Sequence, residues 1–233
     1  NTHAMALLSD IASKLGHLED AEFLLEKAVS FNPKDPEIRK KYLLILRKRQ
    51  KFSKTMEQAD ILCEQYPDNL AFKAQKAIEI MQNGDHEQSI VLLEEILNKA
   101  PFDPNTLTAK GHAEKTLGRT EDAINSYQSA YKSKNDHGEA YFSLANLKTY
   151  TFNDDEISQM NNQVNRIDIS LQDRVYFHFA LSQGFESKGN YDESFYHLES
   201  GNKIKSELVK YSIDRMAKEL QSQIDICTTS FFD

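Results

Sequence analysis

A 34-residue period in the first 135 residues constrains the fold more than any other feature of this sequence. The repeated positions, in order along each copy, are Gly16, Gln50, Gly84 and Gly118; Ala21, Thr55, Ser89 and Ala123; Leu25, Ala59, Leu93 and Tyr127; Ala28, Leu62, Ile96 and Ala130; and Pro33, Pro67, Pro101 and Asn135. Each copy contains two amphipathic stretches, and neither buries its apolar side unless a neighbouring copy covers it. The period therefore predicts an all-α stack of helix pairs.

The residues at the repeated positions predict where each helix begins and ends. First helices are expected at 4–15, 37–50, 71–83 and 105–117, and second helices at 19–31, 53–65, 87–99 and 121–134. Glycine favours the left-handed conformation that ends a helix, and proline stops a helix because it lacks the N–H and clashes with the preceding turn. Asp85 and Gln88 have capping-box spacing, and Thr120 is expected to cap the second helix of the fourth copy.

This spacing resembles the tetratricopeptide repeat, in which helix–turn–helix units stack on one another. The resemblance implies an all-α, right-handed α-solenoid with a C-terminal capping helix. We expect four regular units over 1–135, a degenerate fifth unit over 136–169 and a sixth unit over 170–208. Residues 209–233 are expected to hold the capping helix and the start of a linker to a following domain.

Two helices in the second half of the chain are indicated by apolar spacing. Asn153 and Glu156 have capping-box spacing before a helix whose predicted apolar face consists of Ile157, Met160, Val164 and Ile167. A last helix near 212–226 places Ile213, Met216, Leu220 and Ile224 on one side. We expect this last helix to cover the open end of the stack, which would otherwise expose core residues.

Charge and composition exclude several classes of function. The net charge of −8 argues against a nucleic-acid surface, and no apolar run is long enough to span a bilayer. Cys63 and Cys227 lie far apart and show no disulfide framework, so a reducing, cytoplasmic setting is expected. The chain begins with Asn1 rather than Met, which suggests a fragment of a longer protein.

One segment is strongly basic. Between residues 39 and 54 there are eight cations and no acid: Arg39, Lys40, Lys41, Arg47, Lys48, Arg49, Lys51 and Lys54. One interpretation is a helix whose charges face water. The alternative is a cationic stripe for an acidic partner or a phosphate-bearing ligand.

The sequence carries no recognisable catalytic or metal-binding constellation. The seven histidines include no HExxH motif and no pair four residues apart. His178 and His197 are expected to meet, with Asp192 nearby, and packing with a hydrogen bond explains them better than a metal or acid–base role. Cys63 is interpreted as a buried apolar residue rather than a nucleophile. The sequence therefore predicts no enzyme activity, no cofactor and no metal.

Parts of the second half resemble the repeat region that precedes the catalytic domain in bacterial tetratricopeptide sulfotransferases. The similar stretches, which fall between residues 138 and 205, are Tyr141–Met160, Asp173–Arg174, His178–Leu181, Tyr191–Leu198 and Gly201–Asn202. The resemblance implies a bacterial chain followed by a sulfotransferase domain that uses 3′-phosphoadenosine 5′-phosphosulfate.

The phosphate-binding loop of such a domain is missing from this chain. No GxxxxGK[ST] motif and no Arg-Ser-Gly-Thr loop occurs, and the glycines are scattered at repeat turns. We therefore expect a non-catalytic N-terminal arm that presents a substrate or partner to the catalytic domain. Two alternatives stay open: a repeat region that forms part of a shared active site, and a free-standing adaptor.

The binding surface is expected on the first helix of each unit, because that helix lines the concave groove in tetratricopeptide proteins. The predicted groove residues are Lys40, Leu44, Arg47, Ile78, Met81, His112, Lys115 and Asn146. The expected partner is a protein or peptide of acidic character. Ala6 and Asp10 replace the Lys and Asn that grip a terminal carboxylate in chaperone-binding repeats, which argues against that function. Leu44, Ile78 and Met81 are also explained by packing between units, and Lys41 and Lys48 are predicted on other faces.

Overall fold

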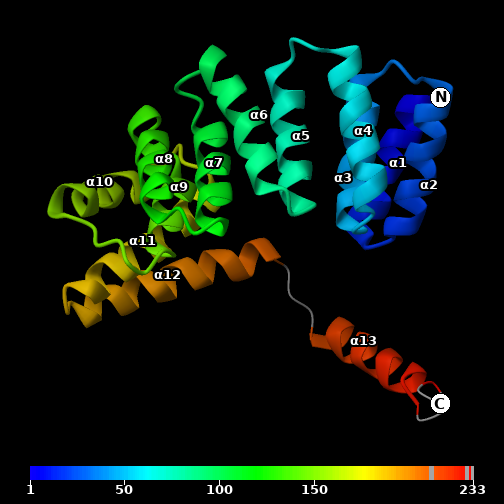
Figure 1. Ribbon diagram of the computed structural model, residues 1–233. Helices are drawn as coiled ribbons and strands as arrows, with labels where there is room; N and C mark the ends of the chain where they lie inside the picture. Colours follow the sequence, from blue (N-terminus) through cyan, green and yellow to red (C-terminus); the bar gives the residue numbers. More distant parts are fainter. Residues whose placement is uncertain (210–212, 229–230, 232–233) are drawn as a thin grey trace. The chain divides into compact units, whose positions relative to one another are not determined.

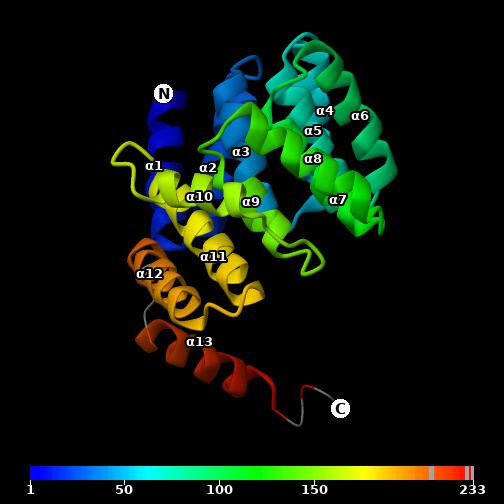
Figure 2. The ribbon, with the colours of Figure 1, turned by 90° about the vertical axis from the view of Figure 1, so that its left-hand side faces the viewer.

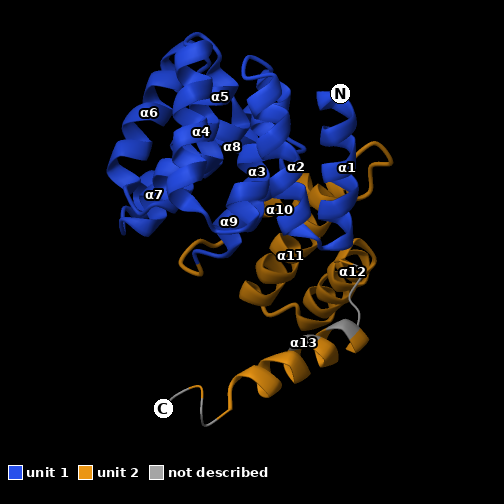
Figure 3. Cartoon of the chain, turned by 90° about the vertical axis from the view of Figure 1, so that its right-hand side faces the viewer, with its two compact units in different colours: residues 1–147 blue, residues 148–233 orange. Residues whose placement is uncertain are grey.

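The computed structural model describes residues 1–209, 213–228 and 231, and these residues form helices and no strand (Figure 1). The predicted all-α class is confirmed. The chain divides into two compact units, residues 1–147 and 148–233 (Figure 3). The division falls inside the stretch 136–169 that was predicted as a single degenerate repeat, so the two helices of that stretch belong to different units.

Unit 1 is a stack of helix pairs in chain order. Its helices are α1 (Thr2–Leu15), α2 (Leu18–Phe31), α3 (Pro36–Lys48), α4 (Phe52–Gln65), α5 (Leu70–Gln82), α6 (His86–Lys99), α7 (Pro104–Thr116), α8 (Thr120–Ser133) and α9 (Gly138–Ala145). Each helix contacts the next one, and the first helices of neighbouring pairs also touch: α1 with α3, α5 with α7 and α7 with α9. The ends of α1 to α8 lie within two residues of the predicted bounds.

The first helices begin at a cap that also repeats every 34 residues. Asn1, Asp35, Asn69 and Asp103 each accept a hydrogen bond from a backbone N–H of the first turn with a side-chain oxygen. Asp85 caps α6 in the same way by accepting from the N–H of Gln88. Thr120 makes no cap: it is the first residue of α8, and the preceding Arg119 has no capping hydrogen bond.

Small residues let the helices of unit 1 approach closely. Ala21, Thr55, Ser89 and Ala123, the small residues of the repeated register, are completely buried. Gly111 allows a further close approach, of α7 to Tyr127 on α8, because a Cβ atom at Gly111 would lie 2.5 Å from Cε1 of Tyr127. The core of the stack is therefore built at the junctions between helices rather than at one centre.

Unit 2 contains α10 (Asp154–Val164), α11 (Leu171–Ser187), α12 (Tyr191–Val209) and α13 (Ile213–Ile226). The predicted capping box is present, since the side chains of Asn153 and Glu156 each accept from the backbone N–H of the other residue. Ile167 was predicted on the apolar face of α10, but the helix ends at Val164 and Ile167 is fully exposed. α11 and α12 lie side by side as a helix pair (Figure 2).

α13 is present at the predicted position but shows no buried apolar face. Ile213, Met216, Leu220 and Ile224 are all exposed. The capping role of α13 stays a prediction. Residues 210–212, part of the predicted capping segment, lie outside the described residues.

Candidate functional site

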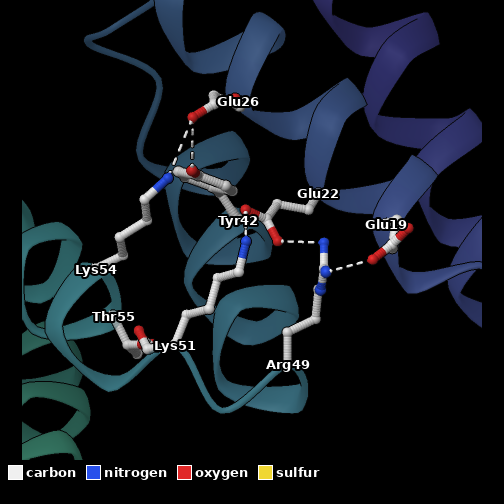
Figure 4. A network of polar contacts seen from close by, with 8 residues as sticks. All are labelled: Glu19, Glu22, Glu26, Tyr42, Arg49, Lys51, Lys54 and Thr55. Carbon is white, nitrogen blue, oxygen red and sulfur yellow. Dashed lines mark hydrogen bonds and ion pairs between the residues drawn. The ribbon is translucent and has the colours of Figure 1, made fainter. Parts of the chain in front are cut away.

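The basic segment of α3 and α4 is mostly paired with acids of the preceding helix pair. Arg49 donates to Glu19 and Glu22 at 2.7 Å each, and Lys51 donates to Glu22 at 2.7 Å (Figure 4). Lys54 lies 3.6 Å from a carboxylate oxygen of Glu26. Burial of Glu22 opposes its ionisation, but the hydrogen bond and charge of Lys51, together with Arg49, outweigh burial and lower its pKa. This network connects the first two repeats.

Arg47 pairs in the other direction along the stack. Its guanidinium forms an ion pair with Glu79 of α5, and Gln75 donates to the same carboxylate at 2.6 Å. Glu79 is buried, and burial raises its pKa against the opposing effects of Arg47 and Gln75. Arg47 was predicted to line a binding groove, and the structure gives it an additional role as the counter-ion of a buried carboxylate.

The remaining cations of the segment have different surroundings. Arg39 is buried and donates to the side chain of Gln58 and to the carbonyl oxygen of Pro33. Lys41 forms an ion pair with Asp10, whereas the exposed Lys40 has no hydrogen-bond or ion-pair partner among the described residues. Five of the eight cations, Lys41, Arg47, Arg49, Lys51 and Lys54, thus pair with acids. Most cations of the segment are therefore paired with acids of neighbouring helices.

A hollow of about 450 Å³, called here the first hollow, lies on the first helices of repeats one and two. Its lining residues are Asp10, Ser13 and Lys14 of α1, Leu25 of α2, and Lys41, Leu44, Ile45, Arg47 and Lys48 of α3. The predicted groove residues Leu44 and Arg47 are among them, but Lys40 is not. Lys41 and Lys48 were predicted on other faces, and this is wrong because both line the hollow.

The lining charge of the first hollow is predominantly positive. Four cations, Lys14, Lys41, Arg47 and Lys48, surround it with the single carboxylate of Asp10. The ammonium group of Lys48 donates to the hydroxyl of Ser13 at 3.0 Å, and Lys14 is exposed. Sequence reasoning missed Lys14 and Lys48 as a pair, although they stand 34 residues apart and so occupy one register.

A second hollow of about 390 Å³ is lined by α5, α6 and α7 and the loop before α7. Ile78 contributes to it with Ala74, Leu93, Ile96 and Ala109, whereas Met81 is half-buried and does not line it. Asp103 is its one charged lining residue. Of the predicted groove residues, Leu44 and Arg47 thus line a cationic hollow and Ile78 lines a separate, largely apolar one.

The predicted groove residues of the fourth and fifth repeats line neither hollow. The Nδ1 atom of His112 lies 2.9 Å from the hydroxyl of Tyr127, and its Nε2 atom lies 3.5 Å from Glu139. The hydrogen bond from His112 lowers the pKa of Glu139 against the effect of burial. Lys115 and Asn146 are exposed, and Asn146 ends α9. His112 is thus held between α8 and α9.

The two histidines of unit 2 meet as expected. The Nδ1 atoms of His178 and His197 are 3.0 Å apart, and the ring of Phe185 stacks on His197. Burial, followed by the charges of His197 and Arg174, lowers the pKa of His178 to about 4. The described residues contain no group of three or more His, Cys, Asp or Glu placed to hold a metal ion. Packing with one hydrogen bond accounts for the pair.

Cys63 does not have the surroundings of a nucleophile. Cys63 packs beside the cluster of Leu43, Ala59, Leu62 and Phe72, and burial raises the pKa of its thiol. Cys227 is a free, exposed thiol. Within the described part of the chain, no helix combines the length and apolar character needed to cross a membrane.

Comparisons with known proteins support the repeat architecture. Residues 45–160 match the family described as the N-terminal TPR repeats region of Psidin, and residues 2–35 match the tetratricopeptide repeat. The structure is similar to that of TTC0263, a thermophilic TPR protein of Thermus thermophilus, with a TM-score of 0.57 and 21% identity over 78% of this chain and 99% of that one. It is also similar to MamA of Desulfovibrio magneticus, with a TM-score of 0.51 and 13% identity over 88% and 96% of the two chains. No curated protein sequence matches.

Proposed function

We propose that this chain, which is built from tetratricopeptide repeats, is a protein-interaction scaffold that holds an acidic and partly apolar peptide segment in the first hollow. The observation that carries the proposal is the lining of this hollow, which combines four cations and one carboxylate, called here the rim, with the apolar residues Leu25, Leu44 and Ile45. Apolar lining residues supply affinity by burial, and a cationic rim selects the charge of the segment.

The cations of the rim differ in how free they are to bind a partner. Lys41 is paired with Asp10, and Arg47 is paired with the buried Glu79. Lys14 and Lys48 have no carboxylate partner among the described residues, so their charges are available to a ligand. Lys14 and Lys48 are therefore the two residues on which the proposed selectivity for acidic segments depends.

A selection of short random peptides on the intact chain tests this proposal. Selected peptides are expected to be rich in Asp and Glu around one or two apolar residues, and their binding measured by fluorescence anisotropy should weaken as salt rises. Replacing Lys14 and Lys48 together by Glu should weaken binding about tenfold or more, since two favourable charges become repulsive. Leu44→Ser should weaken binding without changing the salt dependence.

The matched control is the replacement of Lys34 and Lys99 by Glu, two exposed lysines that do not line the first hollow. This control changes the net charge of the chain by the same amount, so it should leave binding within about twofold. Equal losses of peptide affinity in both double variants would mean that the effect comes from the net charge of the chain rather than from the first hollow. Selected peptides without acidic bias would refute the proposed rim.

The finer hypothesis is that the chain is the cytoplasmic, non-catalytic arm of a bacterial sulfotransferase. It rests on the resemblance of residues 138–205 to the repeat region of that family. The two free cysteines agree with a reducing compartment. Sequencing the parent gene beyond Asp233 tests it: a phosphosulfate-binding loop should follow, and its absence would leave a free-standing adaptor. The second alternative, a shared sulfotransferase active site, predicts that variants of the chain's own residues abolish sulfate transfer in the parent.

A further inference from the structure

The apolar residues on the outer side of α1 are exposed. Leu7, Leu8, Ile11 and Leu15 have exposed fractions of 64%, 53%, 55% and 67%. Leu8, Ile11 and Leu15 recur at intervals of three and four residues, and Leu7 lies four residues before Ile11, so the four form one stripe along the helix. A helix at the open end of a repeat stack ordinarily presents a polar outer face. The stripe on α1 is instead apolar, as a face that another helix covers would be.

The register of Ile11 is covered in the first helices α3, α5 and α7. Ile45, Glu79 and Ala113 stand 34, 68 and 102 residues after Ile11, and their exposed fractions are 6%, 2% and 0%. Ile45 belongs to a core cluster with Ala21, Leu25 and Ala28 of the preceding repeat. Internal repeats thus bury this register against the repeat before them, and α1 presents the same register uncovered.

The outer side of α12 also carries exposed apolar residues. Leu198 stands 71 residues after Tyr127, at the large packing position of a second helix. The residues of that register in unit 1, Leu25, Ala59, Leu93 and Tyr127, are at most 1% exposed, whereas Leu198 is 43% exposed. Tyr191 and Phe195 lie on the same side of α12 and are 69% and 66% exposed. α12 therefore carries an uncovered face of the kind that receives a following first helix.

We infer that α12 of one molecule packs against α1 of a second molecule. Unit 1 contains four junctions of this type, in which a second helix contacts the next first helix: α2 with α3, α4 with α5, α6 with α7 and α8 with α9. The proposed contact repeats this junction between two copies of the chain. It goes beyond peptide binding in the first hollow, which uses other residues of α1.

The side chains at the two open faces support a second copy as the occupant. At the first junction Glu22 of α2 accepts a hydrogen bond from Arg49, which is an ion pair at 2.7 Å. The residue of α1 in the register of Arg49 is Leu15, and the residue of α12 in the register of Glu22 is Phe195. The first internal junction has opposite charges in these two registers, whereas the third has the apolar residues Ile90 and Leu117, and the two open faces are apolar like the third junction. Leu15 and Phe195 therefore match each other.

The contact is heterologous, because the two molecules use different surfaces. Such contacts add subunits until the assembly closes into a ring or extends as a filament. The chain has a mass of 26.8 kDa. The average mass of the sedimenting species is therefore expected to rise with protein concentration beyond that of a dimer.

Two variants that each block one face test the proposal by complementation. Ile11→Asp blocks the α1 face and Phe195→Glu blocks the α12 face, so each variant alone is expected to sediment as a monomer at all concentrations. An equimolar mixture should form a dimer, because the intact α12 face of the first variant meets the intact α1 face of the second. Circular dichroism should show unchanged helicity, since both replaced residues are exposed.

The control is Phe102→Glu, which alters an exposed aromatic residue between α6 and α7 and should associate as the unaltered chain does. The proposal would be overturned if the unaltered chain stayed monomeric at every concentration. That result is expected if α13 covers α12 within one molecule. Association that persists in Phe195→Glu alone would also overturn it, because a symmetric α1–α1 contact or a contact with α13 would then be the cause. A mixture that stays monomeric would exclude the pairing of these two faces.

Discussion

Arg47 of α3 and Glu79 of α5 form an ion pair between consecutive repeats, and the Glu79 side chain is only 2% exposed. Arg47→Met should lower the free energy of unfolding by about 3 kcal/mol, because it leaves a buried carboxylate without its counter-ion. The double variant Arg47→Met with Glu79→Leu should recover most of this loss. Urea unfolding at neutral pH measures both. A double variant as unstable as Arg47→Met alone would show that the loss comes from packing rather than charge.

Gly111 on α7 is predicted to tolerate no side chain. Its Cβ would lie 2.5 Å from the ring of Tyr127, so Gly111→Ala should destabilise the fold by about 1 to 3 kcal/mol through overpacking. Gly184 on α11 is the matched control, because a Cβ there would meet its nearest neighbours at 3.5 Å. Gly184→Ala should be neutral or stabilising by up to about 1 kcal/mol, since alanine favours a helix. In thermal unfolding, the melting temperature should fall for Gly111→Ala and should stay unchanged or rise for Gly184→Ala.

Gln50 occupies the turn position that glycine occupies in three other repeats, and its φ of 56° is left-handed. Gln50→Gly should raise the free energy of unfolding by up to about 1 kcal/mol, since glycine adopts this conformation without steric cost. The converse change, Gly16→Ala, should destabilise by about 1 kcal/mol although no atom lies within 4 Å of the added Cβ. Denaturant unfolding of both variants checks the pair. Destabilisation by Gln50→Gly would mean that the Gln side chain makes a contribution larger than the backbone strain.

His178 makes the stability of the fold depend on pH. Its pKa is lowered from 6.5 to about 4, first by burial, so the unfolded chain binds a proton at this residue at higher pH than the folded chain does. The stabilisation is therefore present above pH 6.5 and is lost as the pH falls toward about 4. The expected loss is on the order of 2 kcal/mol.

The variant His178→Gln removes this titration while keeping a polar side chain opposite His197. Urea unfolding between neutral pH and pH 4 should show a shallower decline of stability in the variant than in the unaltered chain. Parallel declines in the two proteins would assign the pH dependence to other groups.

The sequence predicts the helices and their packing registers well, because both follow from a period that recurs in four copies. The complete burial of Ala21, Thr55, Ser89 and Ala123 agrees with their position in the period. The end of α10 at Val164 was missed because apolar spacing continues to Ile167 after the backbone has left the helix. The spacing of apolar residues alone does not predict the residue at which a helix ends.

The candidate site is less predictable, because it depends on which flank of a first helix faces its neighbour. Lys40, Leu44 and Arg47 lie on one side of an ideal helix, and Lys41, Leu44 and Lys48 lie on an adjacent side. Only the packing of α3 against α1 decides that Lys41 and Lys48 line the first hollow. The partner of Arg47 did leave a signal: Glu79 is an acid in a register that otherwise holds Ile11, Ile45 and Ala113, so a buried counter-ion was required.

The ion pairs of α3 should make the stiffness of unit 1 depend on salt concentration. On one side α3 and the turn after it are tied to α1 and α2 through Asp10, Glu19 and Glu22, and on the other side α3 is tied to α5 through Glu79. Added salt weakens the exposed pairs of Asp10 and Glu19 and leaves the pairs of the buried Glu22 and Glu79 nearly unaffected. Bending of the first two repeats against each other should thus become easier in concentrated salt, while the elastic resistance between α3 and α5 is retained.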